Sequence, residues 1–364
     1  MKTGLHKNLL LGGGALLILT AGAAAEKRGA LTTYIGPDGG YWNDVANWDN
    51  GIPNGNFDAR IDADPGFDID VLLNSNPVVH NLTIDAGDTL TIFNNRILRL
   101  HSYDGTSVLS NAGSIFLDST ASYTYLQFHP VNANDVFALT GGGEIVGTGN
   151  GPNQLAEAYN QAILHNYDNT FRGSSINICA NGLEFINDGL VVSDSGGIIL
   201  IDPPDGFHYG CTNGGTIRAD GGDMDLGYGH FGNDGGVIEA LNGSLVRLAN
   251  GAHIHGGMIR GIDGGEVRST TGASYLNLAT GFTPTIEGTL RVENNRTLRT
   301  YGPGEVHNTG SIILDSTGSY TYLQVHPENA NDVVTLTGAG EIVGIAGGPN
   351  QIAEAYNQEI GRAS

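Results

Sequence analysis

A long stretch of this chain occurs twice. Residues 113–147 and residues 310–344 agree at 28 of 35 positions without a gap, and the two copies begin 197 residues apart. The likeness extends in both directions, so the duplicated module covers residues 94–163 and 294–360. Short apolar runs alternate with Gly and Asn in each copy and show no helical periodicity. A long internal repeat of this kind indicates a repetitive β architecture.

A shorter phrase recurs along the chain. It consists of an apolar residue, Asn, Gly and a β-branched residue, and it continues into an alternating strand. The phrase places Asn187, Asn213 and Asn233 at intervals of 26 and 20 residues. These intervals match one coil of a parallel β-helix with three short strands. We therefore expect an all-β protein, a single-stranded parallel β-helix (solenoid) over residues 78–364.

The same phrase predicts which side chains stack between coils. Its asparagines should form a ladder at one corner, where stacked amides can hydrogen-bond one another: Asn111, Asn187, Asn213, Asn233 and Asn308. The apolar residues that precede them should form one inward column: Leu109, Phe185, Cys211, Phe231 and Val306.

Two cysteines occur in the chain, Cys179 and Cys211. Export would permit a disulfide between them. The place of Cys211 in the apolar column favours instead a buried free thiol that packs as a small hydrophobic side chain. Both alternatives stay open at the level of the sequence.

Residues 1–25 have the pattern of a secretory signal. Lys2 and Lys7 precede an apolar stretch at residues 9–21, and three alanines at residues 23–25 offer a cleavage site. The apolar stretch is too short and too rich in glycine to span a membrane comfortably. We expect an exported, soluble mature chain without an integral membrane segment.

The formal net charge of −22 limits the classes of partner. An acidic surface repels nucleic acid and anionic membranes, so we expect neither as a partner. It is compatible with cation binding and with an ordinary soluble secreted surface.

Residues 26–77 are interpreted as an N-terminal cap with the first strands. The segment contains the only two tryptophans, Trp42 and Trp48, which could close the end of an elongated core. Stacking on a sugar is the alternative role for these rings.

Two aspartate-rich stretches allow a calcium ion as cofactor. Asp62, Asp64, Asp68 and Asp70 surround Gly66, and residues 221–229 resemble a single glycine-aspartate nonapeptide. The first stretch lacks the order of an EF-hand loop, and the second lacks tandem copies. A solvated strand and turn is the simpler interpretation, and we expect no metal site. His253 and His255 lie on one strand face without an identifiable third ligand, which favours surface histidines.

The motifs together resemble a known family. These are the W-x5-W-x2-G-x-P opening from Trp42, the V-x-N-L-T-I segment from Val79, the repeated N-x-G-x-I units and the duplicated L-T-G-x-G-E-I-V-G. The chain resembles secreted or surface parallel β-helix proteins of bacteria, autotransporter-passenger-like or adhesin-like, often found with PEP-CTERM-type sorting signals. The resemblance implies a right-handed β-helix and an extracellular or cell-surface setting in a bacterium. It transfers no catalytic residues.

A non-enzymatic role in adhesion, matrix contact or glycan contact is the first functional hypothesis. The duplicated module presents the same side chains twice, which favours multivalent binding, and aromatic faces can stack on sugars. The candidate binding residues are Tyr123, Tyr125 and His129 with their second-copy counterparts Tyr320, Tyr322 and His326. Lateral packing of these tyrosines beneath a loop is the alternative.

A polysaccharide lyase or glycoside hydrolase is the second hypothesis, because such enzymes need paired carboxylates or a basic residue in one groove. The nearest cluster in the sequence comprises Arg218, Asp220, Asp223, Asp225 and His230. Asp118 and Asp315 occupy repeated positions, which argues against a unique active site. The aspartates at strand ends are explained by turn chemistry, so we assign no catalytic residue.

Overall fold

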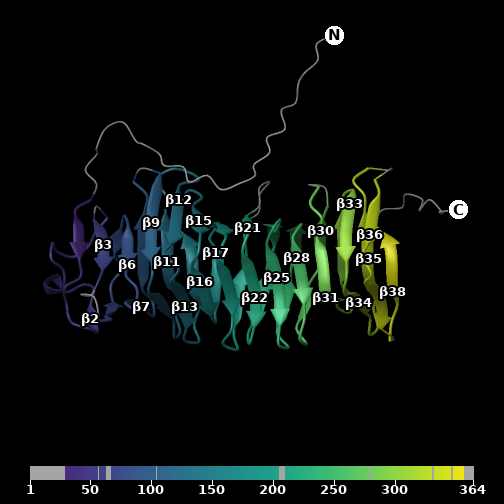
Figure 1. Cartoon of the computed structure of the whole chain (residues 1–364), viewed down its shortest axis with the longest axis horizontal. Helices are drawn as coiled ribbons and strands as arrows, with labels where there is room; N and C mark the ends of the chain where they lie inside the picture. Colours follow the sequence, from purple (N-terminus) through teal and green to yellow (C-terminus); the bar gives the residue numbers. More distant parts are fainter. Residues whose placement is uncertain are drawn as a thin grey trace, which may run out of the picture.

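The protein is an elongated solenoid of parallel β-strands, seen in a computed structural model (Figure 1). The structure describes residues 29–355 apart from residues 56, 63–66, 104, 205–209, 279–280, 330–331 and 346. Within these residues the only helical element is one 3-10 turn, η1 (Val45–Asn47). The all-β parallel β-helix expected from the sequence is confirmed, and its right hand stays a prediction.

Sheet 1 consists of one strand from each coil, paired in parallel with the coils before and after. Its strands are β1 (Leu31–Thr33), β3 (Asp58–Ile61), β6 (Leu82–Ile84), β9 (Thr106–Asn111), β12 (Val136–Thr140), β15 (Ile163–Asn166), β18 (Glu184–Asn187), β21 (Cys211–Asn213), β24 (Gly229–Gly232), β27 (Ala252–His255), β30 (Ala273–Asn277), β32 (Thr297–Tyr301), β35 (Thr321–His326) and β38 (Asn350–Glu354).

Sheet 2 follows sheet 1 in each coil. Its strands are β2 (Gly40–Tyr41), β4 (Asp70–Leu73), β7 (Thr89–Phe93), β10 (Ser114–Asp118), β13 (Glu144–Thr148), β16 (Thr170–Gly173), β19 (Leu190–Ser193), β22 (Thr216–Asp220), β25 (Val237–Leu241), β28 (Met258–Gly261), the first half of β31 (Thr285–Val292), β33 (Gly304–Asn308) and β36 (Val334–Thr337).

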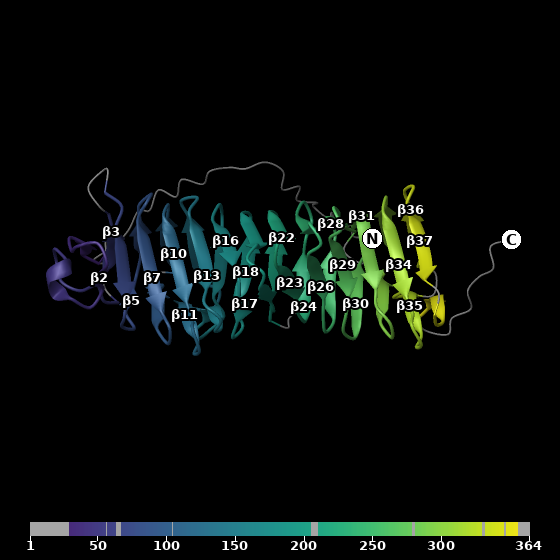
Figure 2. The ribbon, with the colours of Figure 1, turned by 90° about the horizontal axis from the view of Figure 1, so that it is seen from below.

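Sheet 3 completes each coil, so the solenoid has three faces. Its strands are β5 (Val78–Val79), β8 (Ile97–His101), β11 (Thr124–His129), β14 (Asn153–Glu157), β17 (Ile176–Ala180), β20 (Ile198–Ile201), β23 (Asp223–Leu226), β26 (Leu245–Leu248), β29 (Glu266–Ser269), the second half of β31, β34 (Ser311–Asp315) and β37 (Glu341–Ile345). Strands of successive coils follow one another along the long axis in Figure 2.

The core is a set of side-chain columns that run along the solenoid axis. Alternate residues of each strand point inward, and equivalent inward residues of successive coils are direct partners in the sheets. On sheet 2 one such column runs from Ile115 through Ile145, Phe171, Val191, Ile217 and Ile238, all fully buried. The outward row beside this column is mixed, with the apolar Phe116, Val146 and Val192 and the charged Arg172, Arg218 and Glu239.

Buried asparagines form the predicted ladder, although with different members. The Nδ2 atom of Asn166 donates to Oδ1 of Asn187 at 2.9 Å, Asn187 donates to Asn213 at 2.8 Å, and Asn213 donates to Asn233 at 2.7 Å. Each amide occupies an interior corner after a sheet 1 strand and is shielded from water. Because a buried amide without partners costs free energy, the ladder fixes the register of these coils.

Two predicted members of the ladder lie elsewhere. Asn308 belongs to β33 in sheet 2 and donates to the carbonyl oxygen of Glu341 at 3.2 Å. Asn111 lies in sheet 1 but donates to Oδ1 of Asn169 at 2.9 Å. The prediction was wrong for Asn308 because the second copy of the module is shifted by one face of the coil. Asn111 lies on the predicted face, but its strand register aligns it with Ile84, and its amide bonds Asn169 instead of an asparagine of the ladder.

The predicted apolar column is also wrong at its two end members, Leu109 and Val306. Phe185, Cys211 and Phe231 are consecutive partners on sheet 1, as predicted. Leu109 pairs instead with Leu139, which in turn pairs with Asn166, so it lies in the column of the asparagines. Val306 lies in β33 on sheet 2.

Both cysteines are free thiols that are buried in the core. The disulfide alternative for Cys179 and Cys211 is therefore not realised in this structure. Burial raises the pKa of Cys211 to about 12 and also raises the pKa of Cys179. Cys211 packs between two phenylalanines of its column, which explains a thiol that acts as a small hydrophobic side chain.

Both tryptophans are buried in the core. They follow β2 in the chain, and β2 lies at one end of the solenoid in Figure 1. Their rings are 4.8 Å apart in an edge-on arrangement, and Nε1 of Trp48 donates to the carbonyl oxygen of Trp42 at 2.8 Å. Buried rings present no face to a sugar, so the stacking alternative is wrong. Strands β1 to β4 of this segment already pair as coils of the solenoid, and its role as a cap stays a prediction.

The two copies of the module occupy different faces of the solenoid. The first copy begins with β8 of sheet 3 and the second with β32 of sheet 1, so every strand of the second copy is shifted by one face. The second copy follows β31, whose first half pairs in sheet 2 and whose second half pairs in sheet 3. At the corner Gly288 has a φ of +67°, and an added Cβ would lie 1.9 Å from the carbonyl oxygen of Gly261. Only glycine permits this close passage.

Replacing Asn213 with Ala should destabilise the solenoid. The substitution removes a fully buried donor and acceptor and leaves the amides of Asn187 and Asn233 without their partner. A loss of about 1–3 kcal/mol in the free energy of unfolding is expected from such an unsatisfied pair. Urea unfolding followed by circular dichroism measures it. The matched control is Gln351→Ala, because this amide is exposed in the last strand. Equal stability of the two variants would contradict the role of the ladder.

Candidate functional site

The first candidate patch lies on the outer face of sheet 3. The rings of Tyr123 and Tyr125 stack with their centroids 5.8 Å apart and an interplanar angle of 29°. Beside them, Nε of Arg99 donates to Oε1 of Gln127 at 2.5 Å. The ring centroids of His129 and His101 are 4.6 Å apart. We call these six residues, from β8 and β11 with Tyr123 just before β11, the first Tyr–His patch.

The second copy reproduces this arrangement on sheet 1. Tyr320 and Tyr322 stack at 5.8 Å and 17°, and Nε of Arg299 donates to Oε1 of Gln324 at 2.8 Å. The ring of His326 contacts Tyr301, the counterpart of His101, at 5.0 Å. These six residues of β32 and β35, with Tyr320 just before β35, form the second Tyr–His patch.

The structure thus brings together the residues predicted within each copy. Tyr123 and Tyr320 are each 51% exposed, and each stacks on the tyrosine two residues later. Tyr125 and Tyr322 are less exposed than their partners, so lateral packing of the tyrosines stays the alternative to ligand binding. The structure does not unite the two patches, because they face different directions.

One asparagine in each copy positions the turn that carries the exposed tyrosine. Oδ1 of Asn94 accepts hydrogen bonds from three successive backbone N–H groups, those of residues 120–122, at 2.9–3.1 Å. Oδ1 of Asn294 accepts the equivalent three from residues 317–319 at 2.9–3.1 Å. Because the turns are held in the same way, the two tyrosine pairs have the same geometry.

The sequence prediction missed six residues of the patches, which include His101 and its counterpart Tyr301. Arg99 and Gln127, with Arg299 and Gln324, lie between the tyrosines and the histidines on adjacent strands. The signal was present in the sequence, because the upstream motif that contains Asn94 and Arg99 is duplicated together with the tyrosines. Only strand pairing shows that these segments are neighbours.

Burial and nearby charge keep the patch histidines neutral near pH 7. Burial, followed by the positive charge of Arg99, lowers the pKa of His129. Burial, followed by the positive charge of Arg299, likewise lowers the pKa of His326. Burial raises the pKa of Tyr125. A neutral imidazole can both donate and accept hydrogen bonds, which suits a hydroxyl-rich ligand.

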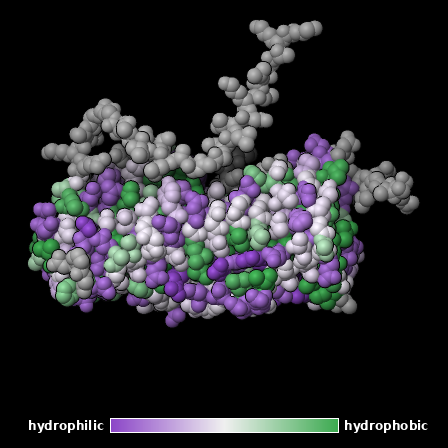
Figure 3. All heavy atoms as spheres, in the orientation of Figure 1, coloured by the Kyte–Doolittle hydropathy of each residue, from purple (hydrophilic) through white to green (hydrophobic). Residues whose placement is uncertain are grey.

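One face of the molecule is mixed in polarity (Figure 3). On the face seen in Figure 3, hydrophobic side chains lie in small groups separated by hydrophilic ones. Such a surface is typical of a protein that is not covered by a large apolar partner. Within the described part of the chain, no helix is long and apolar enough to cross a membrane.

The residues of the enzymatic alternative do not share one groove. Asp220 ends β22 on sheet 2, Asp223 and Asp225 lie in β23 on sheet 3, and His230 lies in β24 on sheet 1. The sequence cluster is therefore spread around the coil.

The charged side chains of this sequence cluster also form ion pairs and hydrogen bonds with neighbouring residues. Both aspartates of β23 bind Arg247, with a distance of 2.8 Å for Asp225, and Arg218 donates to Glu239 at 2.5 Å. The repeated aspartates differ in surroundings, since Asp118 accepts from Thr148 and Asp315 accepts from Arg291.

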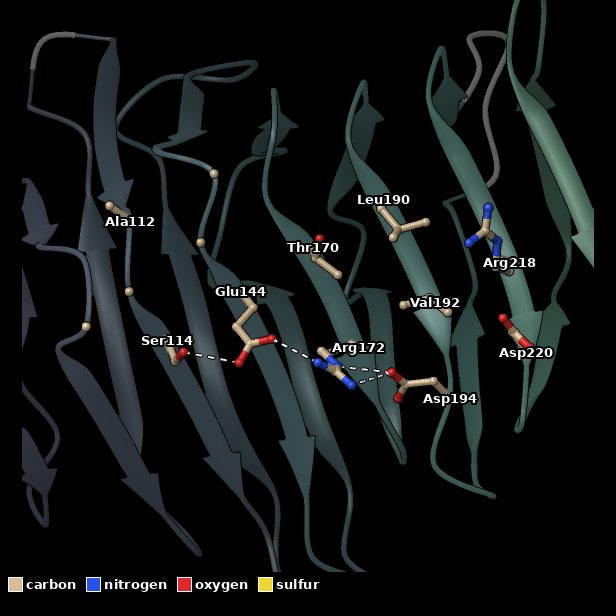
Figure 4. Close-up of a pocket in the computed structure, with 14 residues that line it drawn as sticks. Ala112, Ser114, Glu144, Thr170, Arg172, Leu190, Val192, Asp194, Arg218 and Asp220 are labelled. Atoms are coloured by element: carbon tan, nitrogen blue, oxygen red, sulfur yellow. Dashed lines mark hydrogen bonds and ion pairs between the residues drawn. The ribbon is translucent and has the colours of Figure 1, made fainter.

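An open groove on sheet 2 is lined by Arg218 and Asp220 of this cluster and by further charged residues (Figure 4). Arg172 bridges Glu144 at 3.3 Å and Asp194 at 2.7 Å, and Glu144 also accepts from the hydroxyl of Ser114 at 3.2 Å. One guanidinium thus holds both carboxylates. A general acid and base on a substrate would need carboxyl groups that are not committed to the same cation.

The calcium alternatives have little support among the described residues. No group of three or more His, Cys, Asp or Glu side chains in that part of the chain is arranged to hold a metal ion. Asp62 pairs with Arg60, and Asp70 accepts hydrogen bonds from Thr89 and Thr91. Asp64 and Gly66 of the first stretch lie outside the described residues. The expectation of no cofactor, with calcium as the alternative, stays a prediction.

Histidines from neighbouring coils form a stack on sheet 1. His230 stacks on His253 at 4.5 Å, His253 stacks on Tyr275 at 3.9 Å, and Nδ1 of His230 lies 2.9 Å from Nε2 of His255. The row continues into the second Tyr–His patch, because Nη1 of Arg299 donates to the hydroxyl of Tyr275 at 2.9 Å. The rings lie face to face along the axis, which explains why they do not converge on a metal.

This stack should make the protein less stable in mild acid. Burial, followed by the neighbouring His230, lowers the pKa of His253 to about 4 and that of His255 to about 3. Histidine in an unfolded chain has a pKa of about 6.5. The unfolded state therefore takes up protons first as the pH falls below about 6.5, and stability is lost from there towards the folded pKa values.

We expect a lower urea midpoint at pH 5 than at pH 7. The difference between the two midpoints should be smaller in His255→Gln, which removes one of the two neutral imidazoles. Equilibrium unfolding in urea at both pH values measures the effect. An undiminished difference in the variant would contradict this assignment.

No protein-family model, curated protein or solved structure matches this chain. The resemblance to bacterial surface β-helix proteins therefore rests on the sequence motifs alone and stays a prediction.

Proposed function

We propose that this protein is a non-enzymatic β-solenoid that binds glycans through its two Tyr–His patches. The observation that carries the proposal is the repetition of one outward arrangement on two faces with different neighbours. Tyrosine pairs, an Arg–Gln hydrogen bond and a histidine contact recur with nearly the same geometry. Rings that served only to pack against a neighbouring coil would have no reason to keep this arrangement on another face.

The chemistry of the patches suits a sugar. A half-exposed tyrosine ring offers an apolar face to the C–H face of a pyranose. Gln, Arg and neutral His side chains beside it can hydrogen-bond hydroxyl groups. The sites are shallow, so a single sugar residue would bind weakly, and useful affinity would come from repeated contacts with a polymer.

Export supports an extracellular or cell-surface role. The signal pattern at residues 1–25, which lie outside the described residues, and the resemblance to bacterial surface proteins both favour a secreted or surface location. Adhesion or contact with an extracellular matrix is the corresponding biological setting. The dispersed and ion-paired carboxylates give the enzymatic alternative no specific support.

Removing the exposed ring of each patch should abolish glycan binding. In the double variant Tyr123→Ala with Tyr320→Ala, each patch loses the side chain that is most open to a ligand. We expect at least a tenfold loss of affinity, about 1.4 kcal/mol, on a glycan array and by calorimetry with the best ligand. Tyr228→Ala is the matched control, because Tyr228 is also 51% exposed and lies outside both patches. Unchanged binding by the double variant would overturn the proposal.

Each chain should bind two short oligosaccharides independently. From β12, the strand after β11, to β35 the chain advances eight coils along sheet 1, so the patches are roughly 40 Å apart at about 4.8 Å per coil and face different directions. A short ligand cannot contact both. Calorimetry should give two sites per chain, and Tyr123→Ala alone should leave one site of unchanged affinity. A single site that is lost in this variant would contradict two equivalent patches.

A further inference from the structure

The arginines of the two patches differ from the other arginines of the protein. Seven arginines have a carboxylate oxygen within 4.0 Å: Arg60, Arg172, Arg218, Arg247, Arg260, Arg268 and Arg291. Four arginines in the described part of the chain form no ion pair there. These four are Arg96 and Arg99 with their second-copy counterparts Arg296 and Arg299.

This pattern is unexpected for a chain with a formal net charge of −22. Acidic residues exceed basic ones more than twofold, 38 against 16, so an arginine readily finds a carboxylate. Elsewhere arginines and carboxylates form close ion pairs. The fully buried Glu239, for example, lies between Arg218 and Arg260, with an N···O distance of 2.5 Å to each. The duplicated module instead keeps, in both copies, an arginine beside its tyrosines that has no carboxylate oxygen within 4.0 Å among the described residues.

The guanidinium groups also retain unused donors. An arginine has five N–H donors. Among the described residues, Arg99 makes one side-chain hydrogen bond, from Nε to Gln127. Arg299 makes the same bond to Gln324 and a second one to the hydroxyl of Tyr275. Each guanidinium is thus oriented by a neighbour and still able to bind an anion.

We propose that the ligand of each Tyr–His patch is an anionic sugar residue, whose carboxylate or sulfate binds Arg99 or Arg299 while its ring lies on the tyrosines. This inference rests on the proposed function and narrows its ligand. Gln127 is the direct strand partner of Arg99 and lies two residues from Tyr125, which places the Cα atoms of Gln127 and Tyr125 about 7 Å apart along the strand. One sugar residue can bridge such a distance.

The positive charge of Arg99 or Arg299 should attract an anionic ligand more strongly than the acidic surface as a whole repels it. At physiological ionic strength the Debye length is about 8 Å, so carboxylates several coils away are largely screened. A guanidinium in direct contact with a carboxylate or sulfate forms a charge-assisted hydrogen bond, which is stronger than a neutral one. The patches are therefore the places on this surface where an anion is attracted.

The test compares one oligosaccharide with and without its charge. Calorimetry with an oligogalacturonate and with its methyl ester, which keeps the sugar and removes the charge, should show at least tenfold tighter binding of the free acid. A sulfated oligosaccharide of similar length forms a third arm and decides between carboxylate and sulfate as the preferred anion. Equal binding of the acid and the ester, together with no gain for the sulfated sugar, would overturn the inference.

The variants identify the residues responsible. Arg99→Gln with Arg299→Gln should remove the preference for the anionic ligand, so that the free acid and its methyl ester bind with equal affinity. The control pair Arg60→Gln with Arg172→Gln changes the net charge equally but affects arginines that already have carboxylate partners. A preference that survives in the first pair would overturn the inference. Failure of the wild type to bind any of these sugars would instead contradict glycan binding itself.

Discussion

Parallel pairing between successive coils is the interaction on which the rest of the structure depends. Each strand satisfies its backbone hydrogen bonds with the coils before and after, and no strand in the middle of the solenoid has a free edge. The pairing also brings equivalent side chains of successive coils into contact. The apolar columns, the asparagine ladder and the outer rows of charge all follow from this one repeat distance of about 4.8 Å.

The same stacking acts differently inside and outside the solenoid. Inside, a column is stable when its members are apolar or when buried amides bond one another, as in the run from Asn166 to Asn233. Outside, like charges on neighbouring coils would repel one another. The sign of the charge therefore alternates from coil to coil, as in Arg218, Glu239 and Arg260. The Tyr–His patches depart from this pattern because their arginines bind glutamine and have no carboxylate oxygen within 4.0 Å among the described residues. That departure is the basis of the functional proposals.

The duplicated module shows how much of a residue's role is decided by its surroundings. Leu139 is completely buried between coils, whereas its counterpart Leu336, in the last coil that the structure describes, is 47% exposed. The outward residues are less affected, since each patch depends mainly on contacts between two adjacent strands of its own copy. A module of this kind can therefore move to another face and keep its surface chemistry.

The sequence by itself determined the all-β class, the coil, the inward and outward alternation, and the pairing of each exposed tyrosine with its neighbour. It could not determine the face on which a strand lies, because alternation separates inside from outside but does not distinguish three sheets. Turn lengths and the corner at Gly288 determine the face on which each strand lies. For this reason Asn308 and Val306 lie on sheet 2 and not in their predicted columns. Only the tertiary structure brought Arg99 beside Gln127 and directed the two patches to different faces, because these relations arise from strand pairing between coils rather than from neighbours in the chain.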